Sequence, residues 1–427
     1  MANLKETLEE KIPLWRSAAR ELLKENADTV VSRITVKQLF KGWRGVNAVL
    51  CDTSYVDPKD GLYIRGIPVL ELIDRSAEEI FFLLCTGELP SPEALQALEN
   101  DIQSRAEVPK YVWRTLMKLP EDTHPMTMLS IAMLAMQRES VFLKRYNEGM
   151  AKTDRWEATL EDALNIIARL PVVAATIYRV GIQKKEFIPP QPGLNFSDNF
   201  ANMLGIEDPN STFKEFVKRF VVVHSDHEGA NASVLTSRVV NSSLSDLYYS
   251  ISGAMNSLAG PLHGLANQES VKFVQTIETE FGGVPEKAAL KDYTWNLLQS
   301  GKVIPGFGHA VLRFHDPRYT ALFDFGKTIC PNDTVFRIVE MLGNVVPPLL
   351  KKQGKAKNPY PNIDGISGAL LYHFGMTDLG YYTVMFSVAQ ILGICAQLIA
   401  ERAVFGSIFR PKSVTTRWLQ SFVKDVY

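Results

Sequence analysis

The most apolar helix-length segment of the chain is 381-YYTVMFSVAQILGICAQLIAERA-403. Its apolar run, Phe386 to Ala400, is shorter than the roughly 20 residues that a membrane-spanning helix needs. It also contains two polar residues, Gln390 and Gln397. Length and composition therefore predict a helix buried in the core of a globular protein.

Helical periodicity extends over most of the remaining chain. Ser76 and Glu79 form a Ser-x-x-Glu capping box, and 91-SPE-93 combines an N-cap serine with proline in the first helical position. Helices are predicted over residues 2–26, 76–86, 91–106, 126–137, 157–178, 212–224, 243–258, 268–281 and 381–403.

Strand signals occur only near the N-terminus. They comprise Thr35-Val36, the segment Val46 to Thr53, and Tyr63-Ile64. We therefore predict a mainly α-helical protein with a small N-terminal β element.

Composition excludes several classes of protein. The chain has 427 residues, and its 46 basic and 47 acidic side chains give a net charge of −1, which argues against nucleic-acid binding and against a disordered tail. The four cysteines form no CxxC pair, so neither a disulfide framework nor a zinc ribbon is expected. The N-terminal sequence MANLKETLEEKIPLW has no apolar core and is too acidic for a transit peptide. We expect a soluble, cytoplasmic protein, although a processed chain of the mitochondrial matrix would look the same.

The first of three histidine motifs is 224-HSDHEG-229. An HxxH pair on a helix can bind a metal, but no third ligand is evident, and Gly229 favours a helix end. We therefore favour a hydrogen-bonding role or a substrate contact over a metal site.

The second motif is 260-GPLHGLANQE-269. His263 is expected near a helix N-terminus, where the helix dipole lowers the pKa of an imidazole and favours its neutral form. A neutral imidazole can donate a hydrogen bond to a carbonyl that becomes an enolate. A histidine that fills a tight turn would explain the same pattern equally well.

The third motif is 303-VIPGFGHAVLR-313. Its glycines allow the backbone to approach a ligand closely, but the third glycine of a dinucleotide-binding fingerprint is missing. His309 with Arg313 and Arg318 suits an anionic carbonyl substrate, because arginine binds carboxylates in a bidentate manner. Surface salt bridges would explain either arginine just as well.

Asp364 lies in 361-PNIDGISG-368, between a Pro-Asn turn and an expected helix. The residue is either the N-cap of that helix or a carboxylate that acts as a base.

Taken together, the segments HSDHEG, GPLHGLANQE, PGFGHAVLR-x2-DPRY, KAKNPYPNID and ERAVFGSIFRPKS resemble the citrate synthase family, and most of all its eukaryotic-type branch. The similarity extends from Asn3 to Ser413. It implies a mostly helical, two-domain homodimer, with a large domain (1–264 and 376–427) and a small domain (265–375) that closes over the substrates. The implied reaction condenses acetyl-CoA with oxaloacetate and water to citrate and CoA, the first step of the tricarboxylic acid cycle.

The resemblance also implies a catalytic set. Asp364 removes a methyl proton of acetyl-CoA, neutral His263 stabilises the resulting enol, and His309 polarises the oxaloacetate carbonyl. Local chemistry agrees, because a thioester methyl proton is too weakly acidic for a free carboxylate without an oxyanion stabiliser nearby.

Substrate contacts follow from the same resemblance. Oxaloacetate is held by His227, Arg318, Arg410 of the partner subunit and the residue at position 390, here Gln390. The residues expected to bind CoA are Val303, Ile304, Pro305, Gly306, Phe307, Gly308, Arg313, Lys357, Asn362 and Arg44. No cofactor and no metal are implied, since acetyl-CoA is a substrate, and neither nucleic acid nor a membrane is an expected partner.

Gln390 departs from the family pattern, which has a carboxylate-binding arginine at this position. Loss of one partner of a desolvated charge pair costs roughly 2–5 kcal/mol. Gly365 and Ile366 also differ from the eukaryotic-type Ala-His, and Arg238 is an unexpected charge. Three hypotheses follow: a citrate synthase that tolerates Gln390; a relative that uses another acyl-CoA or 2-oxo acid, such as a 2-methylcitrate synthase; or a catalytically impaired dimer.

Overall fold

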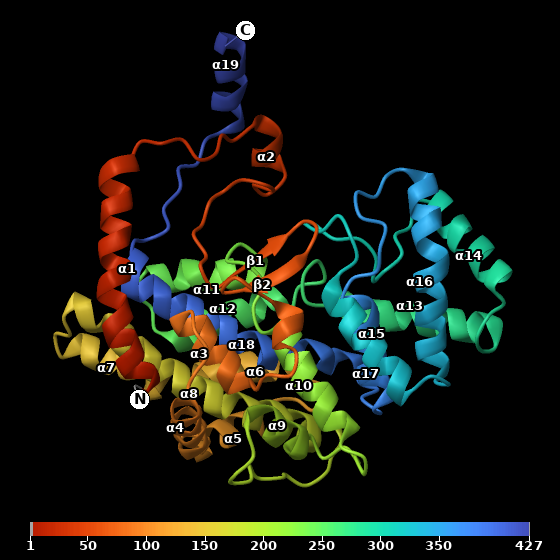
Figure 1. Cartoon of the computed structure of the whole chain (residues 1–427), viewed down its shortest axis with the longest axis horizontal. Helices are drawn as coiled ribbons and strands as arrows, with labels where there is room; N and C mark the ends of the chain where they lie inside the picture. The colour runs from red at the N-terminus through yellow and green to blue at the C-terminus, as the bar shows by residue number, and fades with distance from the viewer. Residues whose placement is uncertain (1–2, 427) are drawn as a thin grey trace.

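Helices make up most of the computed structural model, which describes residues 3–426 (Figure 1). The first part of the chain forms α1 (Leu4–Asn26), α2 (Val36–Phe40), α3 (Ala77–Thr86), α4 (Pro92–Ser104), α5 (Lys110–Leu116), α6 (Pro125–Met136), α7 (Val141–Asn147), α8 (Arg155–Thr176), α9 (Phe196–Leu204), α10 (Thr212–His224), α11 (Ala232–Ser242) and α12 (Leu247–Leu258). The second part forms α13 (Ala266–Phe281), α14 (Lys287–Gln299), α15 (Pro317–Ile329), α16 (Thr334–Gln353), α17 (Asp364–His373), α18 (Tyr382–Ala400) and α19 (Thr416–Val426). The predicted mainly α-helical fold class is confirmed.

Local sequence signals set the starts of these helices. The Ser76 hydroxyl accepts a hydrogen bond from the Glu79 amide at 3.1 Å, and the Glu79 carboxylate accepts one from the Ser76 amide at 2.8 Å. The Ser91 hydroxyl accepts from the Ala94 amide at 3.2 Å, and Pro92 opens α4. The predicted capping box and N-cap are both confirmed.

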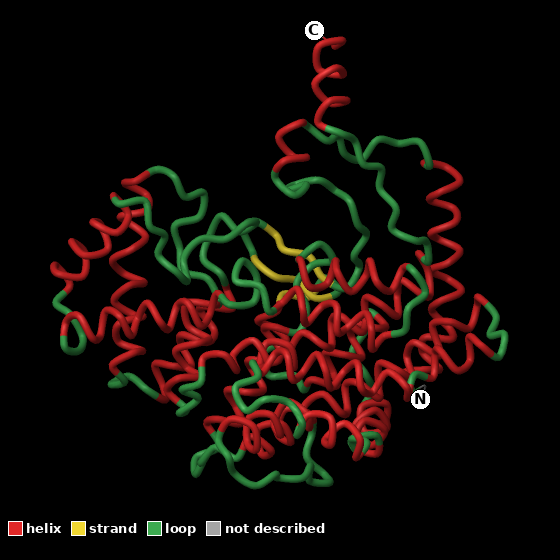
Figure 2. Tube along the Cα trace, turned by 180° about the vertical axis from the view of Figure 1, so that it is seen from behind, coloured by secondary structure: helices red, strands yellow, loops and turns green. Residues whose placement is uncertain are grey.

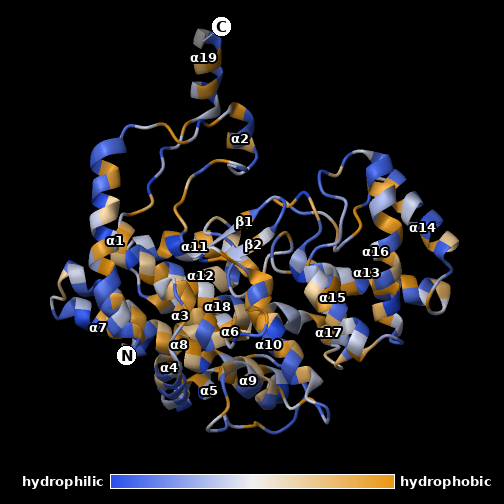
Figure 3. Ribbon diagram, in the orientation of Figure 1, coloured by the Kyte–Doolittle hydropathy of each residue, from blue (hydrophilic) through white to orange (hydrophobic). Residues whose placement is uncertain are grey.

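The apolar segment quoted above forms α18, which packs against α3, α8, α10 and α12. By length and composition, two helical stretches could span a membrane, Lys152–Ile182 and Leu379–Phe405. However, 72% and 89% of their apolar windows are buried inside the protein. Figure 3 shows apolar residues concentrated on the central helices, which include α3, α8 and α18. These stretches therefore serve as core helices.

The β element is a three-stranded antiparallel sheet in the order β1-β2-β3. Its strands are β1 (Ser54–Asp57), β2 (Gly61–Ile64) and β3 (Ile67–Pro68). The prediction of a strand at Tyr63-Ile64 is confirmed.

The two other strand predictions are wrong. Thr35 is the N-cap of α2, where its hydroxyl accepts a hydrogen bond from the Gln38 amide at 3.3 Å. Residues 46–53 form no strand. Local β propensity produces a strand only where a neighbouring strand supplies hydrogen-bond partners, and none lies beside these segments.

Helices α13 to α17 gather on one side of the molecule, on the right in Figure 1 and on the left in the rear view of Figure 2. Helices α13, α16 and α17 pack on one another, and α14 packs on α16. Helix α15 contacts both α17 and α10, so it lies at the junction with the rest of the protein. This group corresponds to the predicted small domain, 265–375, and its closure as a unit stays a prediction.

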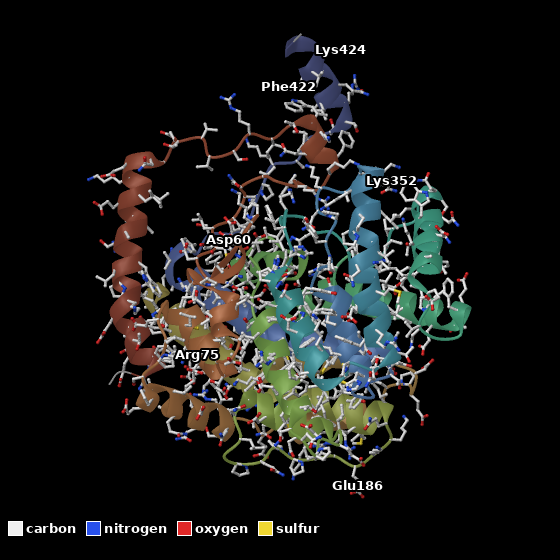
Figure 4. The ribbon with its side chains drawn as sticks, turned by 45° about the vertical axis from the view of Figure 1, so that its right-hand side comes forward. Asp60, Arg75, Glu186, Lys352, Phe422 and Lys424 are labelled. Carbon is white, nitrogen blue, oxygen red and sulfur yellow. The ribbon has the colours of Figure 1, made fainter. Side chains whose placement is uncertain are left out.

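Two segments extend away from the body on the same side (Figure 1). One comprises residues 27–50 and carries α2. The other follows Phe405 and carries α19, on which Figure 4 labels Phe422 and Lys424.

Gly393 is the point where α18 meets the loop after α10. Its amide donates to the Ser225 carbonyl at 2.9 Å, and a β-carbon there would lie 2.6 Å from Asp226 Cβ and closer still to the Ser225 carbonyl oxygen. We expect Gly393→Ala to lower the free energy of unfolding by about 1–3 kcal/mol, because the methyl group overpacks against backbone. Denaturant unfolding would measure the change.

The matched control is Gly181→Ala, whose β-carbon would meet Met128 Cε at 3.6 Å, an ordinary contact. This variant should be as stable as the wild type or slightly more stable. Equal stability of Gly393→Ala and the wild type would contradict the close approach.

Candidate active site

His227 lies in the loop between α10 and α11, next to a buried carboxylate. Asp226 accepts hydrogen bonds from Thr53 Oγ1 at 2.5 Å, from Gln397 Nε2 at 2.8 Å and from the His227 amide at 3.0 Å. Burial raises the pKa of Asp226, and these donors oppose the rise by favouring the charged form. The loop is therefore fixed both to the segment before β1 and to α18.

His224, the other histidine of the HxxH pair, belongs to the core. It is the last residue of α10, its Nδ1 lies 2.8 Å from the Phe220 carbonyl oxygen, and its ring packs edge-on against Phe386. Because α10 ends here, the two imidazoles do not share a helical face. Within residues 3–426, no group of three or more His, Cys, Asp or Glu side chains is placed to hold a metal ion.

His309 lies beside His227, in the loop between α14 and α15. The two ring centroids are 5.6 Å apart. Nδ1 of His309 accepts hydrogen bonds from the amides of Val311 at 3.1 Å and Leu312 at 2.9 Å. A ring nitrogen that accepts amide protons carries no proton of its own, so the neutral ring is protonated on Nε2 and can donate there.

Asp316 and Arg318 form a buried ion pair at the start of α15. Nε and Nη2 of Arg318 donate to the two carboxylate oxygens of Asp316 at 3.0 and 2.9 Å, and the Arg318 amide donates to the same carboxylate at 3.1 Å. Oδ2 of Asp316 also accepts from the amide of Ile363 at 3.1 Å, directly before Asp364. Nη1 of Arg318 makes no hydrogen bond to any described residue, so it is available for a ligand carboxylate.

The two histidines are held neutral by their surroundings. Burial, and then the charge of Arg318, lower the pKa of His227 to about 3 and the pKa of His309 to about 4. Near neutral pH both rings therefore offer neutral hydrogen bonds beside one guanidinium. This combination suits an anion that contains a carbonyl group, as the sequence predicts.

Asp364 is the first residue of α17, and it does not cap the helix. Ile363 occupies the N-cap position, and no side-chain hydrogen bond caps α17, so the N-cap hypothesis is wrong. Burial raises the pKa of Asp364 to about 6, while Arg318 opposes the rise and Asp316 adds to it. A carboxylate with a pKa near neutrality is suited to act as a general base.

The glycine-containing loop 303–308 packs against the start of α17. A β-carbon on Gly306, whose φ is +78°, would lie 2.8 Å from Gly365 Cα. Asn362 joins the two segments, because its Nδ2 donates to the Gly308 carbonyl at 2.7 Å and its Oδ1 accepts from the Asp364 amide at 3.1 Å. The structure thus holds this predicted CoA-binding loop beside the predicted base.

His263 lies three residues before α13, as predicted, and contacts the start of α11. The Ser233 amide donates to Nε2 of His263 at 3.1 Å, and the Ser233 hydroxyl lies 2.9 Å from the same atom. Because Nε2 accepts the amide proton, the ring's own proton is on Nδ1. Burial lowers the pKa of His263, which favours the neutral imidazole.

The other predicted contacts make no direct hydrogen bond to the histidines, Arg318 or Asp364 among the described residues. Gln390 is buried in α18 and bonds to Ser233. Arg44, Arg313, Lys357 and Arg410 are exposed. No hydrogen bond or ion pair within residues 3–426 joins these four exposed side chains to the histidines, Arg318 or Asp364. Their roles as substrate contacts stay predictions.

Three residues of the site are not distinctive enough to be singled out from the sequence. Asp316 precedes Pro317 and Asn231 precedes α11, and both are N-caps. Ser233 carries no signal beyond its place in the first turn of α11. The sequence preferences of N-caps predict where such residues lie. They do not show that the same side chains also form hydrogen bonds to residues of the active site.

The family model described as "Citrate synthase, C-terminal domain" matches residues 42–412. The chain belongs to the citrate synthase family. Citrate synthase 4, mitochondrial, of Arabidopsis thaliana is 43% identical over 432 aligned positions, which cover 99% of this chain and 91% of the relative. Mitochondrial citrate synthases of Daucus carota and Xiphias gladius are 42% and 41% identical, over 99% of this chain and 91% and 92% of their own lengths.

Solved citrate synthases have the same fold. The enzyme of Pyrobaculum aerophilum matches with a TM-score of 0.79 at 26% identity, over 91% of this chain and 95% of its own. That of Thermotoga maritima matches with a TM-score of 0.73 at 27% identity, over 88% and 95%. A ternary complex of the Thermoplasma acidophilum citrate synthase with carboxymethyl coenzyme A and oxaloacetate has a TM-score of 0.76 at 23% identity, over 90% and 97%, and supports the fold alone.

These matches confirm the predicted family, the citrate synthase-like fold and the class of condensing acyltransferase. The curated relatives named above are mitochondrial, so they give no support to the predicted cytoplasmic localisation.

The raised pKa of Asp364, about 6 against an ordinary value of 3.8, makes stability depend on pH. The folded protein binds this proton more tightly than the unfolded chain does. The stability contributed by the protonated carboxyl is therefore fully present below about pH 4 and is lost as the pH rises through about 6. Asp364→Asn cannot ionise, so its free energy of unfolding should increase relative to the wild type between pH 4 and pH 7.

Denaturant unfolding of both proteins across that pH range would measure the difference. Asp60→Asn is the matched control, because Asp60 is exposed, and it should not reproduce the increase. A difference between Asp364→Asn and the wild type that is independent of pH would contradict the burial of this carboxylate.

Proposed function

We propose that this chain is a citrate synthase that condenses acetyl-CoA with oxaloacetate and water to citrate and CoA. One observation carries the proposal: two neutral histidines, His227 and His309, lie with Arg318 near a carboxylate of raised pKa, Asp364. Membership of the citrate synthase family supports the same reaction.

The first chemical step forms an enol from acetyl-CoA. Asp364 takes a proton from the methyl group, and the Nδ1 proton of neutral His263 is donated to the thioester oxygen as negative charge develops there. The methyl proton alone is too weakly acidic for a carboxylate, so the base and the fixed donor must act together. The Ser233 amide supports this step by keeping the His263 proton on Nδ1.

Oxaloacetate is the partner of the enol. Nη1 of Arg318 binds a carboxylate, and His227 donates a further hydrogen bond. The Nε2–H group of His309 donates a hydrogen bond to the ketone oxygen, which makes the ketone carbon more electrophilic. As the enol carbon bonds to this carbon, the enol proton returns to Nδ1 of His263 and the thioester C=O bond re-forms. The former ketone oxygen takes the Nε2 proton of His309 and becomes the hydroxyl of citryl-CoA, and the proton held by Asp364 restores His309 through solvent. Water then hydrolyses the thioester, which releases citrate and CoA.

Domain closure brings the two substrates together. His309, Arg318 and Asp364 belong to the group α13 to α17 with its connecting loops, whereas His227 and His263 belong to the rest of the chain. Closure of residues 265–375 completes the site and excludes water until condensation has occurred. No cofactor takes part.

The working form is a homodimer. Helix α19 has 11 residues, extends from the body and presents the stacked rings of Trp418 and Phe422, each 49% exposed. A helix this short is not stable alone in water, so it requires a partner surface. The exposed apolar side chains on residues 27–50, among them Val31 and Phe40, provide one on a second copy. Arg410, on the same C-terminal tail, then reaches the active site of the partner.

Two narrower points follow from the named relatives and from position 390. The mitochondrial relatives favour the mitochondrial matrix over the cytoplasm as the compartment. Because Gln390 replaces the expected carboxylate-binding arginine, a 2-methylcitrate synthase and an impaired dimer are the alternatives, and an assay that varies the acyl-CoA distinguishes them.

The direct test measures thiol release from acetyl-CoA with and without oxaloacetate, and repeats the assay with propionyl-CoA. We expect release from acetyl-CoA that requires oxaloacetate, and a slower rate with propionyl-CoA. Asp364→Ala should remain dimeric and lose at least about a hundredfold in rate, because the general base is gone. A faster rate with propionyl-CoA would favour 2-methylcitrate synthase, and no release with either substrate would favour the impaired dimer.

A mixing experiment tests the shared site. Arg410→Ala and Asp364→Ala chains should each be inactive alone, whereas a mixed dimer has one site with both residues intact. Random subunit exchange should restore roughly a quarter of the wild-type rate, since half of the dimers are mixed and each has one complete site. No recovery after exchange has been verified by mass spectrometry would show that Arg410 does not act across the interface.

A further inference from the structure

Gln390 is 2% exposed and takes part in a hydrogen-bond network at the start of α11. Its Oε1 accepts a hydrogen bond from the Ser233 hydroxyl at 3.1 Å, and its Nε2 lies 3.5 Å from Asn231 Oδ1. The Ser233 hydroxyl also lies 2.9 Å from Asn231 Oδ1. The amide of Gln390 is therefore occupied by two side chains of α11 and its cap.

The same two side chains contact the histidines assigned to the two substrates. The amide and hydroxyl of Ser233 lie 3.1 and 2.9 Å from Nε2 of His263. Asn231 Nδ2 donates to the carbonyl oxygen of His227 at 2.6 Å. Through Ser233 and Asn231, Gln390 thus connects the histidine that stabilises the enol with the loop that carries an oxaloacetate-binding histidine.

We propose that Gln390 is a positioning residue that sets the orientation of His263 through Ser233, and that of the His227 loop through Asn231. This inference rests on the proposed function, since both histidines take their roles from it. It differs from the interpretation of Gln390 as a weakened carboxylate clamp, in which the side chain would act directly on oxaloacetate.

The chemistry of the side chain supports this assignment. The Ser233 hydroxyl has one proton, for which Gln390 Oε1 at 3.1 Å, Asn231 Oδ1 at 2.9 Å and His263 Nε2 at 2.9 Å are the acceptors within reach. An arginine has five N–H donors and no acceptor, so it could not take that proton. Without Oε1, Asn231 Oδ1 and His263 Nε2, each 2.9 Å from the hydroxyl, are the acceptors that remain. The hydroxyl then turns toward one of them, and its contact with the imidazole changes.

The test is a double-mutant cycle of steady-state kinetics. Gln390→Met keeps the length of the side chain without its hydrogen bonds, and Ser233→Ala removes the hydroxyl. Ser237→Ala is the matched control, because Ser237 is buried one turn further along α11 and its hydroxyl donates only within that helix, to the Val234 carbonyl. Thermal unfolding of each variant verifies folding, and Gln390→Asn, whose amide is too short to reach Ser233, replaces Gln390→Met if that variant is unfolded.

We expect Gln390→Met to lower kcat roughly tenfold, with the KM for oxaloacetate changed by less than about threefold, as for loss of one positioned hydrogen bond. The double variant Ser233→Ala with Gln390→Met should be no slower than the slower single variant, because both changes break one linkage. Ser237→Ala should leave kcat unchanged.

Two results would overturn the inference. One is a raised KM for oxaloacetate at unchanged kcat, which is the signature of a carboxylate clamp. The other is a double variant whose loss in kcat equals the product of the single losses, which would mean that Gln390 does not act through Ser233. An inactive wild type would instead overturn the proposed function, so the two failures can be told apart.

Discussion

The contact between Asp316 and Arg318 organises the active site. The buried carboxylate of Asp316 caps α15 and accepts two hydrogen bonds from the guanidinium of Arg318. It also accepts a hydrogen bond from the amide of Ile363, the residue before Asp364. Because the pair is nearly removed from water, its charges act strongly on their neighbours. Burial first, and Arg318 in addition, lower the pKa of both His227 and His309, and Arg318 limits the rise that burial causes at Asp364. The same contact therefore fixes the geometry of the site and adds to the effect of burial on the protonation of its residues.

The helices of the core place these groups at their ends rather than along their lengths. Helix α18 is apolar on nearly every face, and Gly393 lets the loop after α10 approach it closely. That loop carries His227, while the starts of α11, α15 and α17 bring Ser233, Arg318 and Asp364. The first amide groups of a helix have no acceptor within the helix. They can therefore donate hydrogen bonds to carboxylates, imidazoles and the oxygens of a bound substrate.

The sequence predicts α3 and α4, whose capping signals act locally, and the central apolar helix α18. Long and specific motifs also predict a site that contains His263, His309 and Asp364, and the roles of these residues stay predictions. Prediction from the sequence fails for residues 46–53, where a strand would need a partner from elsewhere in the fold. It likewise misses Asp316, whose N-cap pattern says nothing of Ile363, 47 positions later in the chain. Local sequence patterns carry no information about contacts between segments that are distant in the chain.

The charge balance of the site has a consequence for the proposed homodimer. Asp316 offsets the charge of Arg318, and Gln390 is neutral and occupied by Ser233 and Asn231. Oxaloacetate has two carboxylates, and a buried anion without a matching cation is costly. Among the predicted oxaloacetate contacts, Arg410 of the partner subunit is the remaining positive charge. A relative with arginine at position 390 would have an additional cation within the same chain, so loss of the dimer should impair substrate binding more severely here.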